Sequence, residues 1–421
     1  MKRRPTLLLK NVSIPGGRSA DILMEGTTIR HVGAGSDADQ VIDCSQLLVV
    51  PAAVDLHVHM RGGPQAAKED WESGSRSAIA GGVTVVADQP NTIPALTTPE
   101  AFAARVADAK AHSLCSFAIN SGVTAATPLA AMWEAGASAF GETFFAPSSY
   151  GDAVDATTLT RALAEIGRLG AVATIHAEEV APGEDSSLVD HARIRSAAGE
   201  VRAVEAVSSC NTTGCRIYFC HMSSSRSVAV AKGIVEVTPH HLFLSHETFD
   251  PLDTLGKMNP PLRTEKERKD LYAAWDRIDI IASDHAPHTR DEKSAGFAAA
   301  PSGVPGVETL LPLLLAEVVA KRISLADVIA KTSQNPSRIL GIEPAGFEPG
   351  CRADFVLCPR KETTITAENL HSRCGWTPFE GMKGVFPTRV IMGGQVVYED
   401  GEFRKGDPAW IPGKGYRPGR K

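Results

Sequence analysis

Eight short apolar runs, rich in β-branched residues, recur along the chain and are separated by stretches in which apolar residues have helical spacing. The runs are 47–59, 83–91, 113–123, 137–145, 171–178, 216–223, 234–244 and 279–288. Strands that alternate with helices pair in parallel, because each helix carries the chain back across the sheet. Eight such units close into a barrel. The sequence therefore predicts an α/β fold, a TIM-type (β/α)8 barrel over residues 51–345.

Helical signals between these runs support the alternation. Apolar residues recur at helical spacing from 99 to 111, where Thr98 can cap the first turn and Pro99 can open the helix. Residues 155–168 and 264–277 carry similar patterns. We expect helices over all three segments.

The two ends of the chain differ from the barrel segment. Short β-type runs broken by turns occupy 6–12, 22–25, 28–32 and 40–43, and the pattern resumes at 353–358, 388–392 and 395–398. Neither end has enough apolar residues for a core of its own. We expect both ends to pair into one small β-sandwich, its N-terminal part in residues 1–50 and its C-terminal part, with a tail, in residues 346–421.

Composition excludes several classes of partner. A net charge of −6 offers no basic surface, so nucleic acid is not an expected partner. Because the sequence has no run of about 18 apolar residues, we expect no membrane span. The eight cysteines are scattered and form no Cys-x-x-Cys pair, which predicts reduced thiols and a cytoplasmic protein.

Ionisable residues gather where the predicted strands end, which is where such barrels carry their chemistry. His57 and His59 end the first run and, two residues apart on a strand, face the same side. His176 and His221 end the fifth and sixth runs, and Asp284 ends the eighth. Imidazole and carboxylate groups are zinc ligands. Any one of these residues could be an incidental polar strand end, but the five together predict a metal site.

The same pattern resembles the amidohydrolase superfamily, and within it the dihydroorotases. The motifs that carry the resemblance are His-Val-His-Met-Arg-Gly-Gly-Pro (57–64), Lys-Glu-Asp (68–70), Ala-Asp-Gln-Pro-Asn (87–91), Asn-Pro-Pro-Leu-Arg (259–263), Asp-His-Ala-Pro-His (284–288) and Gly-Val-Pro-Gly (303–306). The resemblance covers nearly the whole chain. It implies that His57, His59 and Asp284 hold one zinc ion and that His176 and His221 hold a second.

One position departs from the family pattern. Many members bridge two metals with a carboxylated lysine at the end of strand four, but this chain has no lysine between Lys110 and Lys232. Glu142 occupies the matching position and offers carboxylate oxygens in place of a carbamate, with Asp152 in reserve. We expect two zinc ions per chain if Glu142 bridges them, and one otherwise.

The resemblance also implies a reaction. It is the reversible interconversion of dihydroorotate and N-carbamoyl-L-aspartate in pyrimidine biosynthesis, with Asp284 taking the proton of the attacking water and passing it to the leaving nitrogen. Arg61 can bind a substrate carboxylate through two parallel hydrogen bonds. Asn91 and His288 would complete the pocket for that carboxylate. Asn259 and the backbone near Gly303 would contact the ring amide. We expect the pair 240–241 to orient the metal ligands, and residues 289–302 to form a lid.

Two alternatives stay open. One is a hydrolase of the hydantoinase, dihydropyrimidinase or allantoinase type, whose neutral ring would need no carboxylate clamp at Arg61 and Asn91. The other is a non-catalytic homologue that acts as a scaffold, although loss of metal ligands would be its mark and the ligands are present. The expected partner is a small-molecule substrate, and the sequence leaves homo-oligomer formation or association with a transcarbamoylase undecided.

Overall fold

The computed structural model describes residues 5–35, 37–145 and 153–418. Eight parallel strands form its centre, and each corresponds to one of the apolar runs. They are β6 (Ala53–Val58), β7 (Val83–Asp88), β8 (Ser116–Ile119), β9 (Phe140–Phe145), β10 (Val172–Ala177), β11 (Arg216–Phe219), β12 (Ile234–Val237) and β13 (Ile280–Ile281). The predicted strand order along the chain is therefore the observed one.

Two backbone bridges close these strands into a ring. Strands β6, β7 and β8 form one sheet, and β9 to β13 form another in chain order. A parallel bridge between Ser121 and Phe140 joins β8 to β9. On the other side, Val58 pairs with His285, and the His59 amide donates to the His285 carbonyl at 2.8 Å. The predicted (β/α)8 barrel is confirmed.

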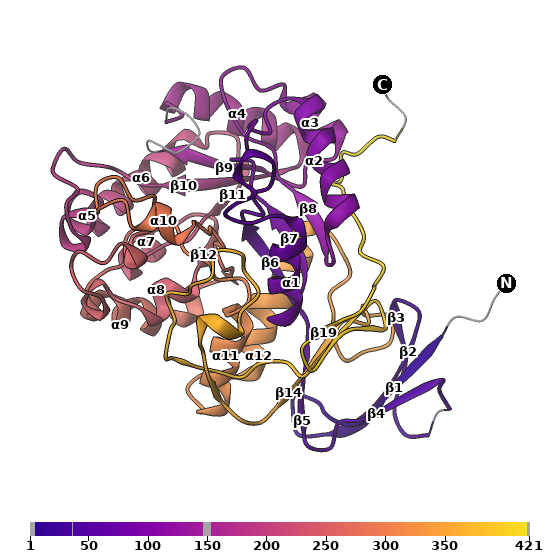
Figure 1. The fold of residues 1–421 in the computed structure, drawn as a ribbon. Coiled ribbons are helices and arrows are strands. Elements are labelled where there is room, and N and C mark those ends of the chain that lie inside the picture. Colours follow the sequence, from indigo (N-terminus) through magenta and orange to yellow (C-terminus); the bar gives the residue numbers. More distant parts are fainter. Residues whose placement is uncertain (1–4, 36, 146–152, 419–421) are drawn as a thin grey trace.

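Helices follow the strands and surround them (Figure 1). Their bounds are α1 (Trp71–Ala80), α2 (Pro99–His112), α3 (Leu129–Ala135), α4 (Ala156–Leu169), α5 (Leu188–Ile194), α6 (Ala197–Cys210), α7 (Ser225–Val230), α8 (Pro239–Phe243), α9 (Glu265–Ala273), α10 (Arg290–Lys293), α11 (Leu310–Val319), α12 (Leu325–Ile329) and α13 (Asn335–Leu340). The expected caps form: the Thr98 side chain accepts from the Ala101 amide, and Thr264 forms a capping box with Glu267.

The first apolar run contains two strands rather than one. β5 (Leu47–Pro51) pairs antiparallel with β14 (Phe355–Pro359), and the chain then enters the barrel as β6. The run 47–59 therefore supplies the barrel with one strand only from Ala53 onward. Both halves of the run are apolar and buried, so periodicity alone gave no sign of the change of sheet.

The two chain ends form the β-rich flank (Figure 1), where the indigo N-terminal strands lie beside the yellow C-terminal ones. One sheet has the order β3-β2-β1-β4 and the other has the order β19-β18-β17-β14-β5. The bounds of strands not yet given are β1 (Thr6–Ser13), β2 (Ser19–Glu25), β3 (Thr28–Val32), β4 (Gln40–Asp43), β15 (Thr363–Thr364), β16 (Lys383–Gly384), β17 (Arg389–Met392), β18 (Gln395–Glu399) and β19 (Glu402–Phe403).

Beyond β19 the chain returns to the barrel. Trp410 forms a parallel bridge with Phe117 of β8, and the Ile411 amide donates to the Phe117 carbonyl at 2.7 Å. This tail therefore lies along a barrel strand and not within the flanking sheets. No helix in the described ranges is long and apolar enough to cross a membrane.

Candidate active site

A cavity of about 550 Å³ opens at the carboxyl ends of the barrel strands. Its lining includes ten of the site residues predicted from the sequence: His59, Arg61, Asn91, Glu142, His176, His221, Asn259, Asp284, His288 and Gly303. His57 is buried and contacts two of these residues, Glu142 and Asp284. The structure thus brings together residues that lie up to 246 positions apart, from His57 to Gly303 (303 − 57).

Six of these residues form what we call the strand-end cluster: His57, His59, Glu142, His176, His221 and Asp284. His57, Glu142 and His176 lie within β6, β9 and β10, and the other three follow β6, β11 and β13 by no more than three residues. The remaining five form what we call the loop set: Arg61, Asn91, Asn259, His288 and Gly303. They lie in the connections that follow the strands.

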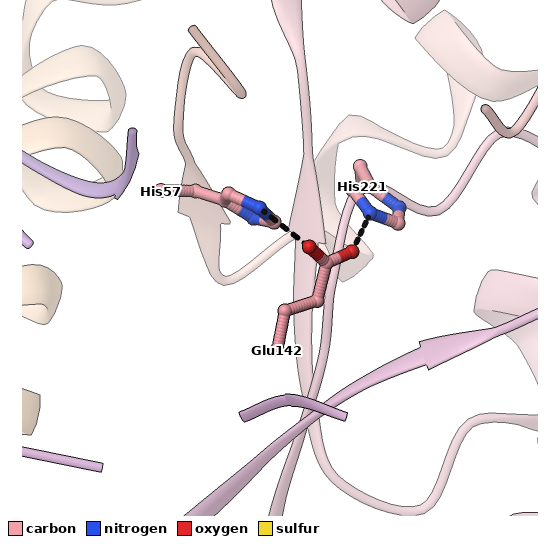
Figure 2. A group of neighbouring side chains, drawn as sticks. All are labelled: His57, Glu142 and His221. Atoms are coloured by element: carbon pink, nitrogen blue, oxygen red, sulfur yellow. Dashed lines mark hydrogen bonds and ion pairs between the residues drawn. The ribbon is translucent and has the colours of Figure 1, made fainter. Parts of the chain in front are cut away.

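Glu142 lies between His57 and His221 of the strand-end cluster (Figure 2). Its Oε2 lies 3.5 Å from Nε2 of His57, and its Oε1 lies 2.8 Å from Nε2 of His221 and 3.0 Å from Nδ1 of His176. Burial would raise the pKa of Glu142, but its hydrogen bonds with His176 and His221 hold this pKa well below the ordinary value. An ionised carboxylate therefore faces histidines from both sides of the cluster.

Asp284 binds to the other side of the same cluster. Its Oδ1 lies 3.1 Å from Nε2 of His59 and 3.5 Å from Nε2 of His57. Burial would raise the pKa of Asp284, yet the charge of His57 and the hydrogen bond with His59 keep it below its ordinary value. Asp284 is thus a buried, ionised carboxylate that reaches the cavity.

Three of the histidines have one ring nitrogen fixed by an oxygen acceptor. His57 donates from Nδ1 to Glu236 at 3.1 Å, His59 from Nδ1 to Asn91 at 2.6 Å, and His176 from Nε2 to Glu178 at 3.0 Å. Such contacts set the tautomer and leave the opposite nitrogen available to a metal. Sequence reasoning missed Glu236 and Glu178. A charged residue inside the otherwise apolar run 234–237 was the signal that could have identified Glu236.

These ring orientations fit a metal. Nε2 of His57 is buried and has no hydrogen-bond partner among the described residues, although carboxylate oxygens of Glu142 and Asp284 each lie 3.5 Å from it. His57, His59 and Asp284 offer ligand atoms within 4.8 Å of one another, and so do His57, Glu142 and His221. Imidazole nitrogens combined with carboxylate oxygens are a donor set that suits zinc. The strand-end cluster is therefore a candidate metal centre.

The backbone at this end of the barrel is strained. Arg61, His221 and Asp284 all have left-handed backbones, with φ of 47°, 33° and 45°. Residues other than glycine rarely adopt this conformation, and such strain concentrates at functional sites. At His221 the conformation is supported by its amide, which donates to Oε1 of Glu236 at 2.6 Å.

Arg61 presents a buried cation to the cavity. Burial lowers the pKa of its guanidinium to about 10, and the negative charges of Asp284 and Asp88 oppose that shift. Its Nε has no hydrogen-bond partner in the described parts of the chain. Arg105 fixes the backbone here, because its Nη1 donates to the Arg61 carbonyl at 2.7 Å while its Nε donates to Asp88. A charge placed in this way needs an anion to offset its desolvation.

His288 lies beside Arg61 and has a defined tautomer. Its Nε2 donates to the Ser302 carbonyl at 3.1 Å, so Nδ1 accepts from Nζ of Lys68 at 3.3 Å. Burial, together with the positive charges of Arg61 and Lys68, holds the pKa of His288 well below its ordinary value. Lys68 lines the cavity and was not among the predicted site residues. Its place as the first residue of the 68–70 motif was the available signal.

The segment 289–302 contacts the loop set, because its Ser302 carbonyl accepts from Nε2 of His288. It contains α10, and Lys293 donates from Nζ to the carbonyls of Lys257 and Pro301, both at 2.9 Å. At its end, Gly303 has φ of 136°, and a Cβ there would lie 2.6 Å from the Ala286 carbonyl oxygen. Only glycine lets the chain pass so close to the cavity.

The 240–241 pair lies in the first turn of α8, and its hydrogen bonds do not reach the metal-ligand candidates: His241 bonds Thr238 and the Pro260 carbonyl. Neither ring nitrogen of His240 has a partner among the described residues, and burial lowers its pKa to about 3. The orienting contacts come from Glu236 and Glu178 instead. Asp152, the reserve ligand, lies outside the described residues.

Comparison with known proteins agrees with this geometry. Residues 48–397 match the model of the amidohydrolase family. A dihydroorotase of Methanosarcina acetivorans is 40% identical and aligns over 98% of this chain and 97% of its own length. A dihydroorotase of Halobacterium salinarum is also 40% identical, over 93% of this chain and 96% of its own. The resemblance to dihydroorotases inferred from the motifs is confirmed.

Solved structures agree on the fold. The L-hydantoinase of Arthrobacter aurescens superposes with a TM-score of 0.88 at 24% identity, over 94% of this chain and 97% of that chain. A D-hydantoinase of a Thermus species superposes with a TM-score of 0.86 at 24% identity, over 97% of this chain and 99% of that chain. Such low identity supports the barrel with its β-rich flank and nothing finer. On the extent of the family match and the identity to these relatives, the chain belongs to the amidohydrolase family.

Proposed function

We propose that this protein is a zinc-dependent dihydroorotase, a cyclic amide hydrolase that interconverts dihydroorotate and N-carbamoyl-L-aspartate in pyrimidine biosynthesis. One observation carries the proposal: a single cavity is lined by a histidine–carboxylate cluster that fits a metal and by the buried guanidinium of Arg61. The first group suits hydrolysis of an amide, and the second suits a substrate with a carboxylate. The curated relatives named dihydroorotase support the same substrate.

The strand-end cluster would hold two zinc ions. His57, His59 and Asp284 would bind one, His176 and His221 would bind the other, and Glu142 would bridge them in place of a carboxylated lysine. The position of Glu142 between His57 and His221 supports the bridging role (Figure 2). When bound, zinc lowers the pKa of a coordinated water to near neutrality and polarises a carbonyl group.

Asp284 would move the proton. Its carboxylate is ionised and buried and lines the cavity, so it can accept a proton from the attacking water. It would then deliver that proton to the amide nitrogen as the ring opens, and the reverse sequence would close the ring.

Arg61 and Asn91 would bind the substrate carboxylate, and His288 would join them by donating from Nε2 in place of its bond to the Ser302 carbonyl. The oxygen of the Asn91 side chain already accepts from His59, so only its NH2 group remains for an anion. One amide would thus orient a metal ligand and bind substrate. Asn259 and the backbone at Gly303 would contact the ring amide, and residues 289–302 would act as the lid over it.

The alternatives have specific weaknesses. A hydantoinase-type enzyme acting on a neutral ring would leave the buried Arg61 guanidinium without a substrate anion. A non-catalytic scaffold would have no need for an intact histidine–carboxylate cluster. We further propose a cytoplasmic location, because all eight cysteines lie in the described residues and are free thiols. Homo-oligomer formation and association with a transcarbamoylase remain candidates for its assembly.

A substrate panel tests the proposal. The zinc-loaded protein would be assayed with dihydroorotate, dihydrouracil, hydantoin and allantoin, and its metal content measured in parallel. We expect the highest kcat/KM with dihydroorotate. Preference for a neutral ring would establish the hydantoinase-type alternative, and the absence of both bound metal and turnover would establish the scaffold.

A further inference from the structure

His191 lies outside the cavity lining but contacts a residue that lines it. It lies on α5 and its side chain is 1% exposed. Its Nε2 is 2.9 Å from Oδ1 of Asn259 and 3.0 Å from the Met258 carbonyl, and its Nδ1 is 2.9 Å from Oδ1 of Asp185. Neither the motifs nor the reaction described above uses this ring.

The neighbours of His191 determine where its protons lie. The Met258 carbonyl can only accept, so Nε2 must carry a hydrogen. The Asn259 atom that faces the same nitrogen must then be its oxygen, because an NH2 group there would oppose another donor. The NH2 group of Asn259 is left for the cavity that this residue lines. His191 therefore fixes which end of the amide the cavity receives.

The other ring nitrogen of His191, Nδ1, also has a fixed partner. Asp185 accepts from Nδ1 of His191 and pairs with Nζ of Lys257 at 3.1 Å. Burial would raise the pKa of Asp185, but the contacts with His191 and Lys257 lower it to about 2, so it remains an acceptor. Phe297, from the segment 289–302, packs edge-on against the His191 ring with 6.1 Å between centroids.

We propose that His191 is a positioning residue that fixes the side-chain amide of Asn259 as a hydrogen-bond donor toward a carbonyl oxygen of the cyclic amide substrate. Both carbonyl groups of a cyclic imide or ureide ring are acceptors, so a fixed donor binds the ring in one orientation. An amide free to flip would present an acceptor to an acceptor in half of its states. This inference rests on the proposed function for the identity of the substrate.

A double-mutant cycle tests the inference. His191→Leu should lower kcat/KM about ten- to a hundredfold, mainly through KM, because one directed hydrogen bond is lost. His191→Gln, whose side-chain NH2 can replace Nε2, should recover most of the loss. In an Asn259→Ala background His191→Leu should have almost no effect, since coupled residues are non-additive. His112→Leu, at an exposed histidine on α2, is the matched control and should behave as wild type.

The outcomes separate positioning from general packing. An equal loss from His191→Leu with and without Asn259 would overturn the inference, and so would wild-type kinetics in His191→Leu. If that variant does not fold, which its thermal unfolding would show, His191→Phe, which keeps an aromatic ring but has no donor, gives the same cycle alone and combined with Asn259→Ala. If the wild type opens a different cyclic amide, the proposed function fails, and the cycle run with that substrate still tests His191.

Discussion

The strand-end cluster and the loop set line one cavity but are held by different parts of the molecule. Residues of the strand-end cluster lie on barrel strands or within three residues of their ends, and buried carboxylates such as Glu236 on β12 orient them. Residues of the loop set are held by contacts between connections: His191 bonds Asn259, and Lys68 and the Ser302 carbonyl bond His288. The first arrangement resembles a fixed scaffold, and the second depends on several loops packing together.

This difference implies that the strands and the loops have separate functions. Strands hold the groups that would bind metal and move protons, and these are needed for any substrate. Loops hold the groups that would recognise a particular ring, and loops tolerate change more readily. We therefore expect variants of the strand-end cluster to affect all substrates alike, and variants of the loop set to affect substrates unequally.

The largest effect is expected from Asp284→Asn. The amide keeps the shape of the side chain but cannot accept the proton of the attacking water, so kcat should fall by a factor on the order of a thousand. The loss should be the same for dihydroorotate and for any neutral ring that the wild type accepts. Steady-state kinetics with both substrates measures it, and circular dichroism checks the fold. Near-normal turnover would remove Asp284 from the proton-transfer role.

Arg61→Met should separate substrates. Loss of a buried charge pair costs about 2–4 kcal/mol, which corresponds to a roughly 30-fold to several hundredfold lower kcat/KM for dihydroorotate. Activity on dihydrouracil, which has no carboxylate, should change far less. Arg76→Met, at a half-exposed position on α1, serves as the control. Equal losses of kcat/KM on both substrates would assign Arg61 a structural role. They would also contradict the expectation that variants of the loop set affect substrates unequally.

Glu236→Gln should weaken metal binding without touching substrate. The carboxylate accepts from Nδ1 of His57, from the His221 amide and from the Tyr218 hydroxyl. Loss of such an orienting group typically reduces metal affinity about 10- to 100-fold. Competition with a chromogenic chelator measures the affinity, and Glu205→Gln on the exposed face of α6 is the control. Unchanged affinity would show that the strands alone orient His57.

The smallest expected effect concerns Lys293, in the segment 289–302, and is a change in stability with pH. Burial and the charge of Lys257 lower its pKa to about 7, whereas in the unfolded chain it would titrate near 10.5. Between these two pH values the unfolded state binds more protons at this residue than the folded state does. The free energy of unfolding therefore rises with pH, by up to about 1.4 kcal/mol per pH unit. Below pH 7 the cost of the buried charge is fully present.

Urea unfolding at pH 7.5 and 9 would measure this effect. The stability of the wild type minus that of Lys293→Met should rise by about 1–2 kcal/mol over the interval. A difference that does not change with pH would mean that Lys293 keeps its charge in the folded protein. In that case the protonation state of Lys293 would not affect the stability of the loops at the cavity.

Most of the strand-end cluster could be predicted from the sequence, because its signals are local. His57 and His59 stand two residues apart, and each other predicted ligand lies at or near the end of an apolar run. The loop contacts could not be found in this way. His191 lies 68 residues from Asn259 in the chain, so nothing short of the folded structure relates them. The same holds for the pairing of β5 with β14, which divides a run that reads as one strand.

The pair 240–241 shows the opposite failure. Two adjacent histidines after a predicted strand suggested contacts to the metal ligands, but the strand ends at Val237 and a helical turn directs His241 to Thr238 and the Pro260 carbonyl. Residue type alone suggested a role that the backbone geometry does not give. Strand ends are therefore informative only where the strand length is known.

Metal removal and reconstitution tests the central claim most directly. The protein would be stripped with a chelator under conditions that keep it folded, then titrated with zinc while bound metal and dihydroorotate turnover are both recorded. We predict no turnover in the stripped protein, recovery in proportion to bound zinc, and saturation at two zinc ions per chain. Full turnover by protein that holds less than a tenth of an equivalent of any metal would contradict the account.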